Sequence, residues 1–375
     1  MSTPAPAATI PAADPSVARA APAGSNASGA AAAPAWLAPA EDLLAAGAGP
    51  VIAPLDELGI IGVRGVDARR FLHGQLTNDV EHLAADRCQF NGLCTAKGRL
   101  LAVFTQWLDA EAVLLQLPRE VLPGIMRRLA MFVLRSKVAL TDDTAHWHAF
   151  GLTGNGLDAW LAAAGVDPGA QSGMGMQRDG IWWFRQPPGP RCGSRVMAVV
   201  PTAAAAGFIP SLVAAAPGLR AVAPAAWWWS QIDAGVPGLW AVTQERYVPQ
   251  MINLEVLDGV SFAKGCYPGQ EVVARSQYLG KLRRRMAAGH IDTGTAAAGQ
   301  EIVSIAAVDA AAGGPAAQSA GSVVMAAPAP GGGMDLLFEC PTELLAGAVA
   351  LHLGVADGPQ ITVRPLPYLL RDVTA

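Results

Sequence analysis

Apolar residues recur along this chain with two periods, and each period predicts one kind of element. Large apolar side chains follow helical spacing from Asp67 to Val80 and again from Pro118 to Phe132. Short apolar runs predict strands, two of which flank a polar turn as a β-hairpin, at 58–63, 100–108, 112–117, 137–140, 180–184 and 196–200. This mixed order favours an α+β protein with antiparallel sheets over a doubly wound parallel sheet.

The pattern changes at both ends of the chain. Residues 1–48 are rich in Ala, Pro, Ser and Gly and have no period, so we expect a disordered extension that buries too little surface to offset ordering entropy. After Arg285, short strands predict a small C-terminal β-barrel or sandwich. The expected organisation is the extension, a first α+β region at 49–145, a second at 146–282 and a β region at 283–375.

One segment needs a membrane test, because residues 196–219 carry no charge. Pro201, Pro210 and Pro217 interrupt it, and its middle is only weakly hydrophobic. We therefore expect a buried strand followed by an alanine-rich helix, and no membrane partner. The N-terminus lacks a positive region followed by a continuous apolar core, so no secretory signal is expected.

The segment 264–275 (Lys-Gly-Cys-Tyr-Pro-Gly-Gln-Glu-Val-Val-Ala-Arg) carries the strongest candidate chemistry. Its glycines and proline predict a tight turn, after which a helix can begin near Gln270. Cys266 lies in that turn, two residues after Lys264. An ammonium group and a helix N-terminus both stabilise a thiolate, so Cys266 is the candidate catalytic thiol and Lys264 its catalytic partner. The alternative is a structural turn with a buried, inert thiol.

Composition narrows the classes of function. The net charge of −4 does not predict a general nucleic-acid surface, so direct nucleic-acid binding is not expected. Five scattered cysteines form no disulfide pattern and indicate a reducing compartment, here the cytoplasm. Cys88 and Cys94 lack Cys-x-x-Cys spacing, so no metal site is expected. The sequence order of His73, Asp79 and Lys97 predicts no catalytic triad.

Six segments occur in an order that is found in one protein family. They are 71–80 (Phe-Leu-His-Gly-Gln-Leu-Thr-Asn-Asp-Val), 96–100 (Ala-Lys-Gly-Arg-Leu), 232–237 (Ile-Asp-Ala-Gly-Val-Pro), 248–254 (Val-Pro-Gln-Met-Ile-Asn-Leu), 264–271 and 365–368 (Pro-Leu-Pro-Tyr). With them the chain resembles the YgfZ-type folate-binding proteins, relatives of the aminomethyltransferase (T protein) of the glycine cleavage system. The resemblance spans roughly residue 50 to the C-terminus, and the segment 264–271 is its most specific part.

The resemblance implies a fold and a function. The implied fold is a three-domain ring around a folate-sized channel, with two mixed α/β sandwich-like domains and a small C-terminal β-barrel. The implied cofactor is tetrahydrofolate or a related folate. The implied partners are iron–sulfur client enzymes, including one that modifies tRNA, which the protein helps to assemble or repair without holding a cluster itself. This role is that of an accessory protein more than of an enzyme.

The resemblance also implies which residues hold the folate. Trp227 matches a folate-contacting tryptophan of the family, and Asp233 stands where T-protein relatives carry the longer glutamate. Leu58 replaces the family's other folate-contacting tryptophan, which removes ring stacking worth about 1 kcal/mol. Tyr267, within the motif, completes the expected set. A core position for Trp227 and a helix-end position for Asp233 remain open alternatives.

Two further functions stay open beside the accessory role. One is a folate-dependent aminomethyl or one-carbon transferase, which needs a carboxylate near the pterin, and Asp233 is its one clear candidate. The other is a non-catalytic RNA- or protein-binding module that uses a basic run. The basic residues are Arg275, Lys281, Arg283, Arg284 and Arg285. They are also compatible with a solvated group of charges at a domain junction.

Overall fold

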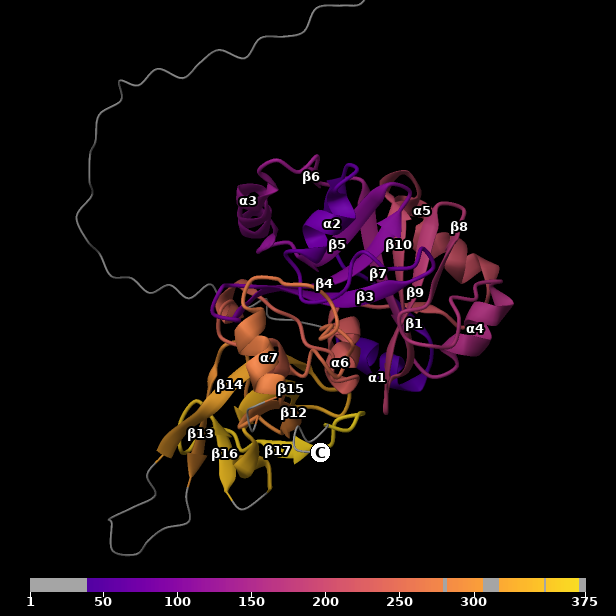
Figure 1. Cartoon of the computed structure of the whole chain (residues 1–375). Coiled ribbons are helices and arrows are strands. Elements are labelled where there is room, and N and C mark those ends of the chain that lie inside the picture. The colour runs from indigo at the N-terminus through magenta and orange to yellow at the C-terminus, as the bar shows by residue number, and fades with distance from the viewer. Residues whose placement is uncertain (1–38, 279–281, 306–316, 347–348, 371–375) are drawn as a thin grey trace, which may run out of the picture. The chain divides into compact units, whose positions relative to one another are not determined.

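The computed structural model describes residues 39–278, 282–305, 317–346 and 349–370 (Figure 1). Helix α1 (Ala40–Ala48) occupies the end of the predicted disordered extension, so that part of the prediction was wrong. Tertiary contacts stabilise the helix, because Leu43 and Ala46 are buried and the Asp42 carboxylate accepts a hydrogen bond from the backbone N–H of Ala223 at 2.9 Å. The rest of the predicted extension, 1–38, lies outside the described residues.

A five-stranded antiparallel sheet with the order β3-β4-β5-β2-β6 forms first along the chain. Its strands are β2 (Leu58–Arg64), β3 (Cys88–Cys94), β4 (Leu100–Asp109), β5 (Ala112–Pro118) and β6 (Ala139–Asp142). Helices α2 (Ala68–His73) and α3 (Leu122–Val133) share one apolar core with the sheet. The predicted hairpin is confirmed, since Asp109 of β4 pairs with Ala112 of β5.

Two helix boundaries in this region differ from the sequence prediction. The helix after Asp67 was expected to reach Val80, but α2 ends at His73, because the next residues leave it to meet β3. The backbone N–H of Thr77 donates to the carbonyl of Gly92 at 2.9 Å. The second helix begins at Leu122 instead of Pro118, because Pro118 is the last residue of β5 and pairs with β2.

A six-stranded sheet with the order β11-β1-β7-β10-β9-β8 follows. Its strands are β1 (Val51–Pro54), β7 (Trp147–Thr153), β8 (Gly175–Arg178), β9 (Ile181–Gly189), β10 (Gly193–Pro201) and β11 (Arg220–Ala221). The pairs are antiparallel except β1 with β11. The sequence did not show that β1 leaves its neighbours in the chain and pairs with β7, about a hundred residues later.

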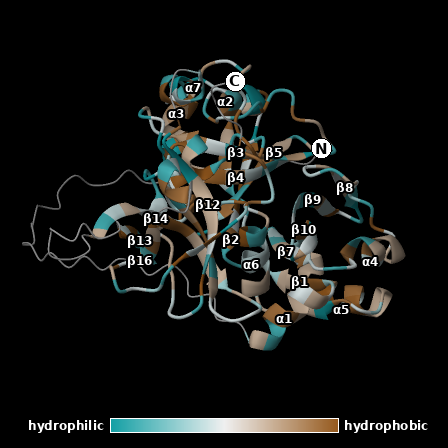
Figure 2. Cartoon of the chain, turned by 90° about the horizontal axis from the view of Figure 1, so that it is seen from below, coloured by the Kyte–Doolittle hydropathy of each residue, from teal (hydrophilic) through white to brown (hydrophobic). Residues whose placement is uncertain are grey.

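Alternation along β10 explains how this sheet is covered on both faces. Val196, Ala198 and Val200 share a core with helices α4 (Leu157–Ala163) and α5 (Thr202–Ala215). Met197 and Val199, which point the other way, share a core with helix α6 (Ala225–Asp233). Figure 2 shows α5 and α6 apart from each other, with β7 and β10 between them. No helix of the described residues is long and apolar enough to cross a membrane.

The C-terminal β region is a six-stranded antiparallel sheet with the order β16-β13-β14-β15-β12-β17. Its strands are β12 (Arg284–Ile291), β13 (Glu301–Ile305), β14 (Ala317–Pro328), β15 (Met334–Pro341), β16 (Ala350–Leu353) and β17 (Thr362–Arg364). A short 3₁₀ helix, η3 (Thr342–Ala346), follows β15. The expected shift from helices to strands after Arg285 is thus confirmed.

The connection between α6 and β12 is largely irregular. It contains two short 3₁₀ helices, η1 (Ala241–Thr243) and η2 (Pro249–Ile252), and then helix α7 (Gln270–Tyr278). The predicted helix start at Gln270 is therefore confirmed. Buried residues of this connection, such as Tyr247 and Leu254, join the largest core cluster. Together the three sheets and their helices confirm the α+β class, with antiparallel pairing dominant.

Candidate functional site

The segment 264–271 forms a turn that packs against the turn between β3 and β4. Gly269 has φ +84° and Gly98 has φ +70°, a region of backbone conformation that favours glycine. A Cβ built on Gly269 would lie 2.4 Å from the Thr95 carbonyl oxygen and 2.7 Å from Gly98 Cα. The two turns can therefore meet this closely only because both positions are glycines.

Lys264 anchors this segment to the end of helix α2. Its ammonium group donates hydrogen bonds to the backbone carbonyls of His73 and, at 2.6 Å, of Leu76. It also lies 4.8 Å from the centre of the Tyr267 ring, within reach of a cation–π interaction. Burial lowers the pKa of Lys264 to about 8, partly opposed by the nearby Asp79 and Cys266. Lys264, the predicted catalytic partner of the thiol, thus connects the turn to α2 through hydrogen bonds. Its catalytic role stays a prediction.

Cys266 differs from the other cysteines in its exposure. The five cysteines are free, and Cys266 is exposed while Cys88, Cys94, Cys192 and Cys340 are buried. Burial raises the pKa of Cys88, Cys94 and Cys340 to about 12 and that of Cys192 to about 11. A high thiol pKa and a lack of access both suppress reaction. Cys266 is therefore the accessible thiol of the chain, and the alternative of a buried thiol does not describe it.

Tyr267 is buried beside Lys264, and burial raises its pKa well above the usual range. It is not among the described residues that line the two cavities discussed below. Its predicted contact with folate stays a prediction.

The carboxylate of Asp233 is occupied by protein donors. It accepts hydrogen bonds from the Arg191 backbone N–H at 2.8 Å, from Arg191 Nε at 2.6 Å and from the Cys192 backbone N–H at 2.9 Å. Asp233 is the last residue of α6 and comes just before Gly235, whose φ is +65°. The geometry therefore agrees with the helix-end alternative, and pterin binding by Asp233 stays an untested prediction.

Trp227 and Leu58 come together on one small cavity. It has a volume of about 50 Å³ and lies between α6 and the face of the five-stranded sheet opposite α2 and α3. Trp227 is buried, and the Arg195 guanidinium lies 4.3 Å from the centre of its ring. A Cβ built on Gly151 would lie 2.3 Å from the Trp227 ring, so this glycine makes room for it. The structure thus brings two predicted cofactor residues to one place.

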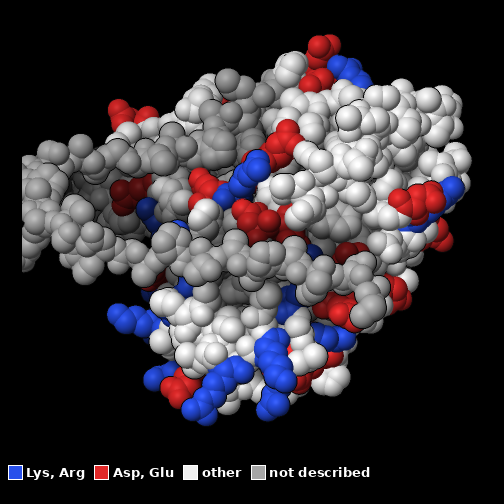
Figure 3. Space-filling view, turned by 90° about the horizontal axis from the view of Figure 1, so that it is seen from above, with Lys and Arg blue, Asp and Glu red and all other residues white. Residues whose placement is uncertain are grey.

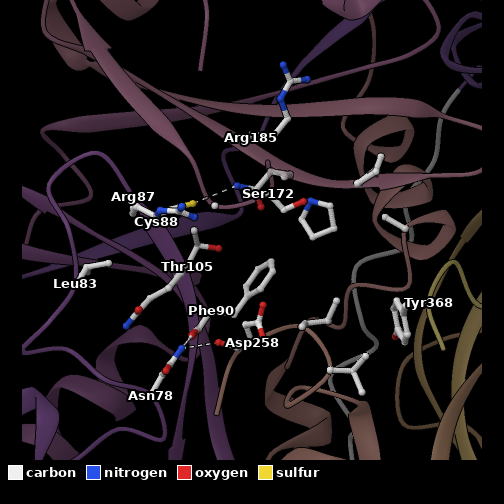
Figure 4. Close-up of a pocket in the computed structure, with 18 of the residues that line it drawn as sticks. Asn78, Leu83, Arg87, Cys88, Phe90, Thr105, Ser172, Arg185, Asp258 and Tyr368 are labelled. Atoms are coloured by element: carbon white, nitrogen blue, oxygen red, sulfur yellow. Dashed lines mark hydrogen bonds between the residues drawn. The ribbon is translucent and has the colours of Figure 1, made fainter. Parts of the chain in front are cut away.

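A larger cavity of about 650 Å³ adjoins the small one. Phe90, Thr105 and Gln186 line both cavities, and in Figure 4 the ring of Phe90 points into the larger one. Tyr368 closes the side of that view opposite Arg87. A volume of this order is typical of pockets for small molecules. The two cavities are therefore neighbours with a common wall, and they are called the chamber below, with the smaller, mostly apolar cavity as its narrow end.

Gln116 supplies an unsatisfied polar group at the narrow end. It lies on β5 opposite Thr105 of β4 and Ile60 of β2, and its side chain lines the small cavity. It is only 4% exposed, and its Nε2 atom has no hydrogen-bond partner among the described residues. An unpaired buried amide costs about 1–3 kcal/mol, which a bound polar ligand can recover. Sequence analysis missed this residue, although one glutamine in the otherwise apolar strand 112–118 was a signal.

The larger cavity carries a few charges at its rim. Arg87 and His82 are exposed residues in its lining, and Arg87 has no ion pair within the described ranges. Arg185 also lines the cavity, but its guanidinium binds Asp158 at 2.5 Å and points away in Figure 4. Asp258 is the one carboxylate among the described lining residues of the two cavities. Cys266 is not among them, so thiol and chamber are separate groups of residues.

The predicted basic run does not form one free patch. Arg285 is buried and paired with Glu255, and Arg284 binds both oxygens of Glu339. Arg283 and Arg275 are exposed, and Lys281 lies outside the described residues. Arg284 and Arg285 therefore stabilise the C-terminal sheet through ion pairs within the chain and are not free to bind a partner.

Comparison with known proteins agrees with the fold and gives the family. No protein-family model matches the chain. Among solved structures, the glycine cleavage system aminomethyltransferase T of Bartonella henselae is similar, with a TM-score of 0.66 over 88% of this chain and 89% of that one, at 14% sequence identity. This likeness concerns the fold alone, which is that of the T protein.

Relatives by sequence are more informative. The tRNA-modifying protein YgfZ of Colwellia psychrerythraea is 30% identical over 239 residues, which are 62% of this chain and 69% of the relative. The protein of the same name from Serratia proteamaculans is 30% identical over 238 residues, 62% of this chain and 68% of its own. That from Vibrio vulnificus is 29% identical over 232 residues. The chain belongs to the YgfZ family.

Proposed function

We propose that this chain is a tetrahydrofolate-binding accessory protein that supports tRNA-modifying enzymes, with Cys266 as its reactive thiol. The observation that carries the folate part is the chamber that ends at the unpaired amide of Gln116. The names of the relatives, tRNA-modifying proteins, support the choice of partner. Assembly or repair of iron–sulfur clusters in those enzymes is the finer part of the proposal.

The residues of the narrow end suit one edge of a pterin, whose ring would lie in the larger cavity because about 50 Å³ cannot hold it. A pterin is a flat ring with hydrogen-bonding edges, so it needs an apolar or aromatic wall and a few polar groups in the plane. Phe90 and Trp227 provide aromatic wall, and Gln116 Nε2 provides a donor for a ring acceptor. When bound, the folate would supply a one-carbon carrier. In this arrangement Gln116 takes the recognition role that the sequence gave to Asp233.

The wide chamber suits the remainder of a folate. The aminobenzoyl-glutamate part ends in carboxylates, which are bound best by cationic side chains. Arg87, which is exposed at the rim of the larger cavity and has no ion pair among the described residues, is the group that we assign to this end. We assign no role in folate binding to Arg185, because its guanidinium is paired with Asp158.

Cys266 and Lys264 form the second half of the proposal. The thiol is exposed, and Lys264 Nζ is held beside the same turn by the carbonyls at the end of α2. An exposed thiol next to a cation can act as a thiolate on a disulfide, a persulfide or a cluster atom of a client. Because Cys266 lies outside the chamber lining, the client meets the thiol on the surface while folate occupies the interior.

Folate-dependent aminomethyl transfer is the second candidate function, and Asp258 favours it. Its carboxylate lies on the larger cavity, where a proton acceptor for a one-carbon reaction is needed. Release of formaldehyde or ammonia from aminomethyl donors, dependent on tetrahydrofolate and lost in Asp258→Asn, would establish this activity.

A binding module for RNA is the third candidate function, and it has less support, because Arg284 and Arg285 are paired with carboxylates of this chain. Figure 3 shows acidic and basic side chains together on the face in view, with several Lys and Arg residues gathered at one edge.

Calorimetry of tetrahydrofolate binding tests the proposed chamber. Gln116→Leu keeps the volume of the side chain but removes the donor, so we expect about tenfold weaker binding, the usual value of one hydrogen bond in a buried site. Gln177→Leu, the same change at an exposed position of β8, is the matched control and should bind like wild type. Equal affinity in Gln116→Leu and wild type would reject the assignment of the narrow end to the pterin.

A genetic test addresses Cys266 separately. In a bacterial strain that lacks its own YgfZ, wild type should restore the modified tRNA nucleosides, whereas Cys266→Ala should not. Cys340→Ala is the control, because Cys340 is a buried thiol of the C-terminal sheet. Full restoration of the modified nucleosides by Cys266→Ala would reject the proposal that Cys266 is the reactive thiol. The proposal of a folate chamber would be unaffected.

A further inference from the structure

Asp79 links two histidines at the end of helix α2. His73 is the last residue of α2, and its Nδ1 atom lies 3.1 Å from Asp79 Oδ1. His82 Nδ1 lies 2.8 Å from the other carboxylate oxygen, Asp79 Oδ2. The side chain of His73 is 15% exposed and that of His82 is 82% exposed. The inner histidine is therefore held in a fixed orientation, and the outer one is at the surface.

The fixed histidine faces the backbone directly before Cys266. Lys264 draws that segment onto α2 by binding the carbonyl of His73 itself. A Cβ built on Gly265 would have one heavy atom within 4 Å, and that atom is His73 Nε2 at 3.9 Å. Gly265 thus leaves space on the side where the imidazole lies. His73 and Gly265, the neighbour of Cys266, are thus close in space although almost two hundred residues separate them in the chain.

This group contains an oriented base near the turn that carries the exposed thiol. When Nδ1–H donates to Asp79, the lone pair of the neutral imidazole is on Nε2. Among the described residues, no hydrogen bond to His73 Nε2 is present in the structure. A carboxylate that orients a histidine next to a nucleophile is the arrangement by which cysteine and serine nucleophiles are activated.

We propose that the Asp79–His73 pair is the proton acceptor for the Cys266 thiol. The proton moves from Cys266 Sγ to His73 Nε2, which leaves a thiolate and an imidazolium, and no other bond forms or breaks. Asp79 acts as a positioning residue that sets the tautomer and stabilises the imidazolium. The inference deepens the proposed role of Cys266, but proton transfer itself requires neither folate nor a client enzyme.

Other charged groups around the pair favour the thiolate, oppose it or are already engaged by other atoms. The Lys264 ammonium favours the thiolate through its charge. Glu81 contributes a more distant negative charge to the same region, as its effect on Lys264 shows. Arg69, also on α2, is engaged by the backbone carbonyls of Val80, Glu81 and Leu83. Two titratable bases therefore lie near the Cys266 turn, and of these Lys264 is engaged by the carbonyls of His73 and Leu76 whereas His73 Nε2 is not engaged by a described residue.

Alkylation kinetics over a range of pH test the proposal on the full-length protein. Trypsin releases residues 265–275, which contain Cys266 as their single cysteine, so mass spectrometry follows its reaction with iodoacetamide directly. In wild type, Cys266 should react faster near neutral pH than a thiol in unfolded protein. His73→Gln should slow this reaction about tenfold and Asp79→Asn should slow it less, while at high pH, where a thiol ionises without a base, the rates should converge.

The matched control is His146→Gln, the same substitution at a histidine that is 74% exposed and lies elsewhere. Its profile should coincide with that of wild type. Coincidence of the His73→Gln profile with wild type would overturn the proposal, whatever the outcome of the folate and tRNA experiments.

A second measurement leaves His73 unchanged, in case His73→Gln does not fold. Nuclear magnetic resonance of the imidazole should show that the titration curve of His73 differs between Cys266→Ser and wild type, because the thiolate partner is lost. An unchanged His73 titration in Cys266→Ser would equally reject the pair.

Discussion

At the scale of single residues, the buried polar side chains near α6 have two kinds of environment. Asp233 accepts three hydrogen bonds from donors of the β9–β10 turn, two at Oδ2 and one at Oδ1. Gln116, across the small cavity from α6, has a donor without a protein partner. Satisfied groups of this kind stabilise a fold, whereas an unsatisfied one costs stability unless a ligand completes it.

The first prediction concerns Asp233→Ala. Removing the carboxylate leaves Arg191 and two backbone N–H groups without their acceptor, so the free energy of unfolding should fall by about 2 kcal/mol. Arg191 is 41% exposed, and solvent reduces the effect below that of a fully buried pair. Tetrahydrofolate affinity of the folded protein should change less than twofold. Urea unfolding and calorimetry measure the two quantities.

The control for this prediction is Asp56→Ala, a carboxylate that is 76% exposed, which should leave stability within about 0.5 kcal/mol. A stable Asp233→Ala protein with strongly weakened folate binding would contradict the prediction and make Asp233 the pterin carboxylate after all.

At the scale of elements, the candidate thiol site is held together by contacts between short segments. The β3–β4 turn meets the start of α7 at Gly98 and Gly269, and Lys264 connects the same segment to the end of α2. None of these segments is a long regular element. Their relative position therefore depends on a few close backbone contacts, and a single Cβ can disturb it.

The second prediction concerns Gly269→Ala. Its new Cβ would lie 2.4 Å from the Thr95 carbonyl oxygen at a φ of +84°, so both clash and backbone strain oppose it. The free energy of unfolding should fall by about 3 kcal/mol. Cys266 alkylation should become faster at high pH, where every thiol is ionised, because the turn opens. Thermal unfolding and alkylation rates check the two effects.

Gly124→Ala provides a matched control within helix α3. Nothing lies within 4 Å of the Cβ position at Gly124, and its φ is not positive, so alanine there should raise stability by about 0.5–1 kcal/mol. If Gly269→Ala proved as stable as wild type, the close contact between the two turns would not exist in solution.

At the scale of the whole described structure, Asp335 joins the C-terminal sheet to α6 and to the β9–β10 turn. Its carboxylate accepts hydrogen bonds from Trp229 Nε1 at 2.9 Å and from Arg364 Nη1 at 2.7 Å. Arg191 Nη2 lies 2.7 Å from it, and so does His290 Nδ1. Asp335 is 1% exposed, so these contacts are made away from water and are strong.

The third prediction concerns Asp335→Ala. Loss of this shared acceptor leaves the buried Trp229 Nε1 and the largely buried His290 Nδ1 unpaired, whereas Arg191 and Arg364 are partly exposed, so the free energy of unfolding should fall by about 2–3 kcal/mol. The C-terminal sheet should also unfold separately from the rest, visible as a second transition in urea and as earlier proteolysis after residue 282. Asp292→Ala, a change at an 88% exposed carboxylate that contacts the same His290, should retain one transition near that of wild type. A single, unshifted transition in Asp335→Ala would contradict the prediction.

The local sequence pattern was enough to predict many of the helices and strands. The alternation of apolar residues predicted the β4–β5 hairpin and the strand before α5, and the start of α7 followed from Pro268 and Gly269. Such features depend on neighbours in the chain, which the sequence displays directly. The boundaries that failed, such as the end of α2 at His73, were decided by pairing with a distant strand.

The sequence by itself determined the α+β class, the motif that carries Cys266 and, through its resemblance, the family, whereas the structure showed that this thiol is exposed. The tertiary structure alone decided which side chains meet: β1 joins β7, Gln116 faces α6, and His73 lies beside the turn of Cys266. The physical reason is that burial and hydrogen bonding of a polar group depend on residues far away in the chain. The same carboxylate or amide can therefore bind a ligand or form hydrogen bonds within the protein, depending on which residues the fold places next to it.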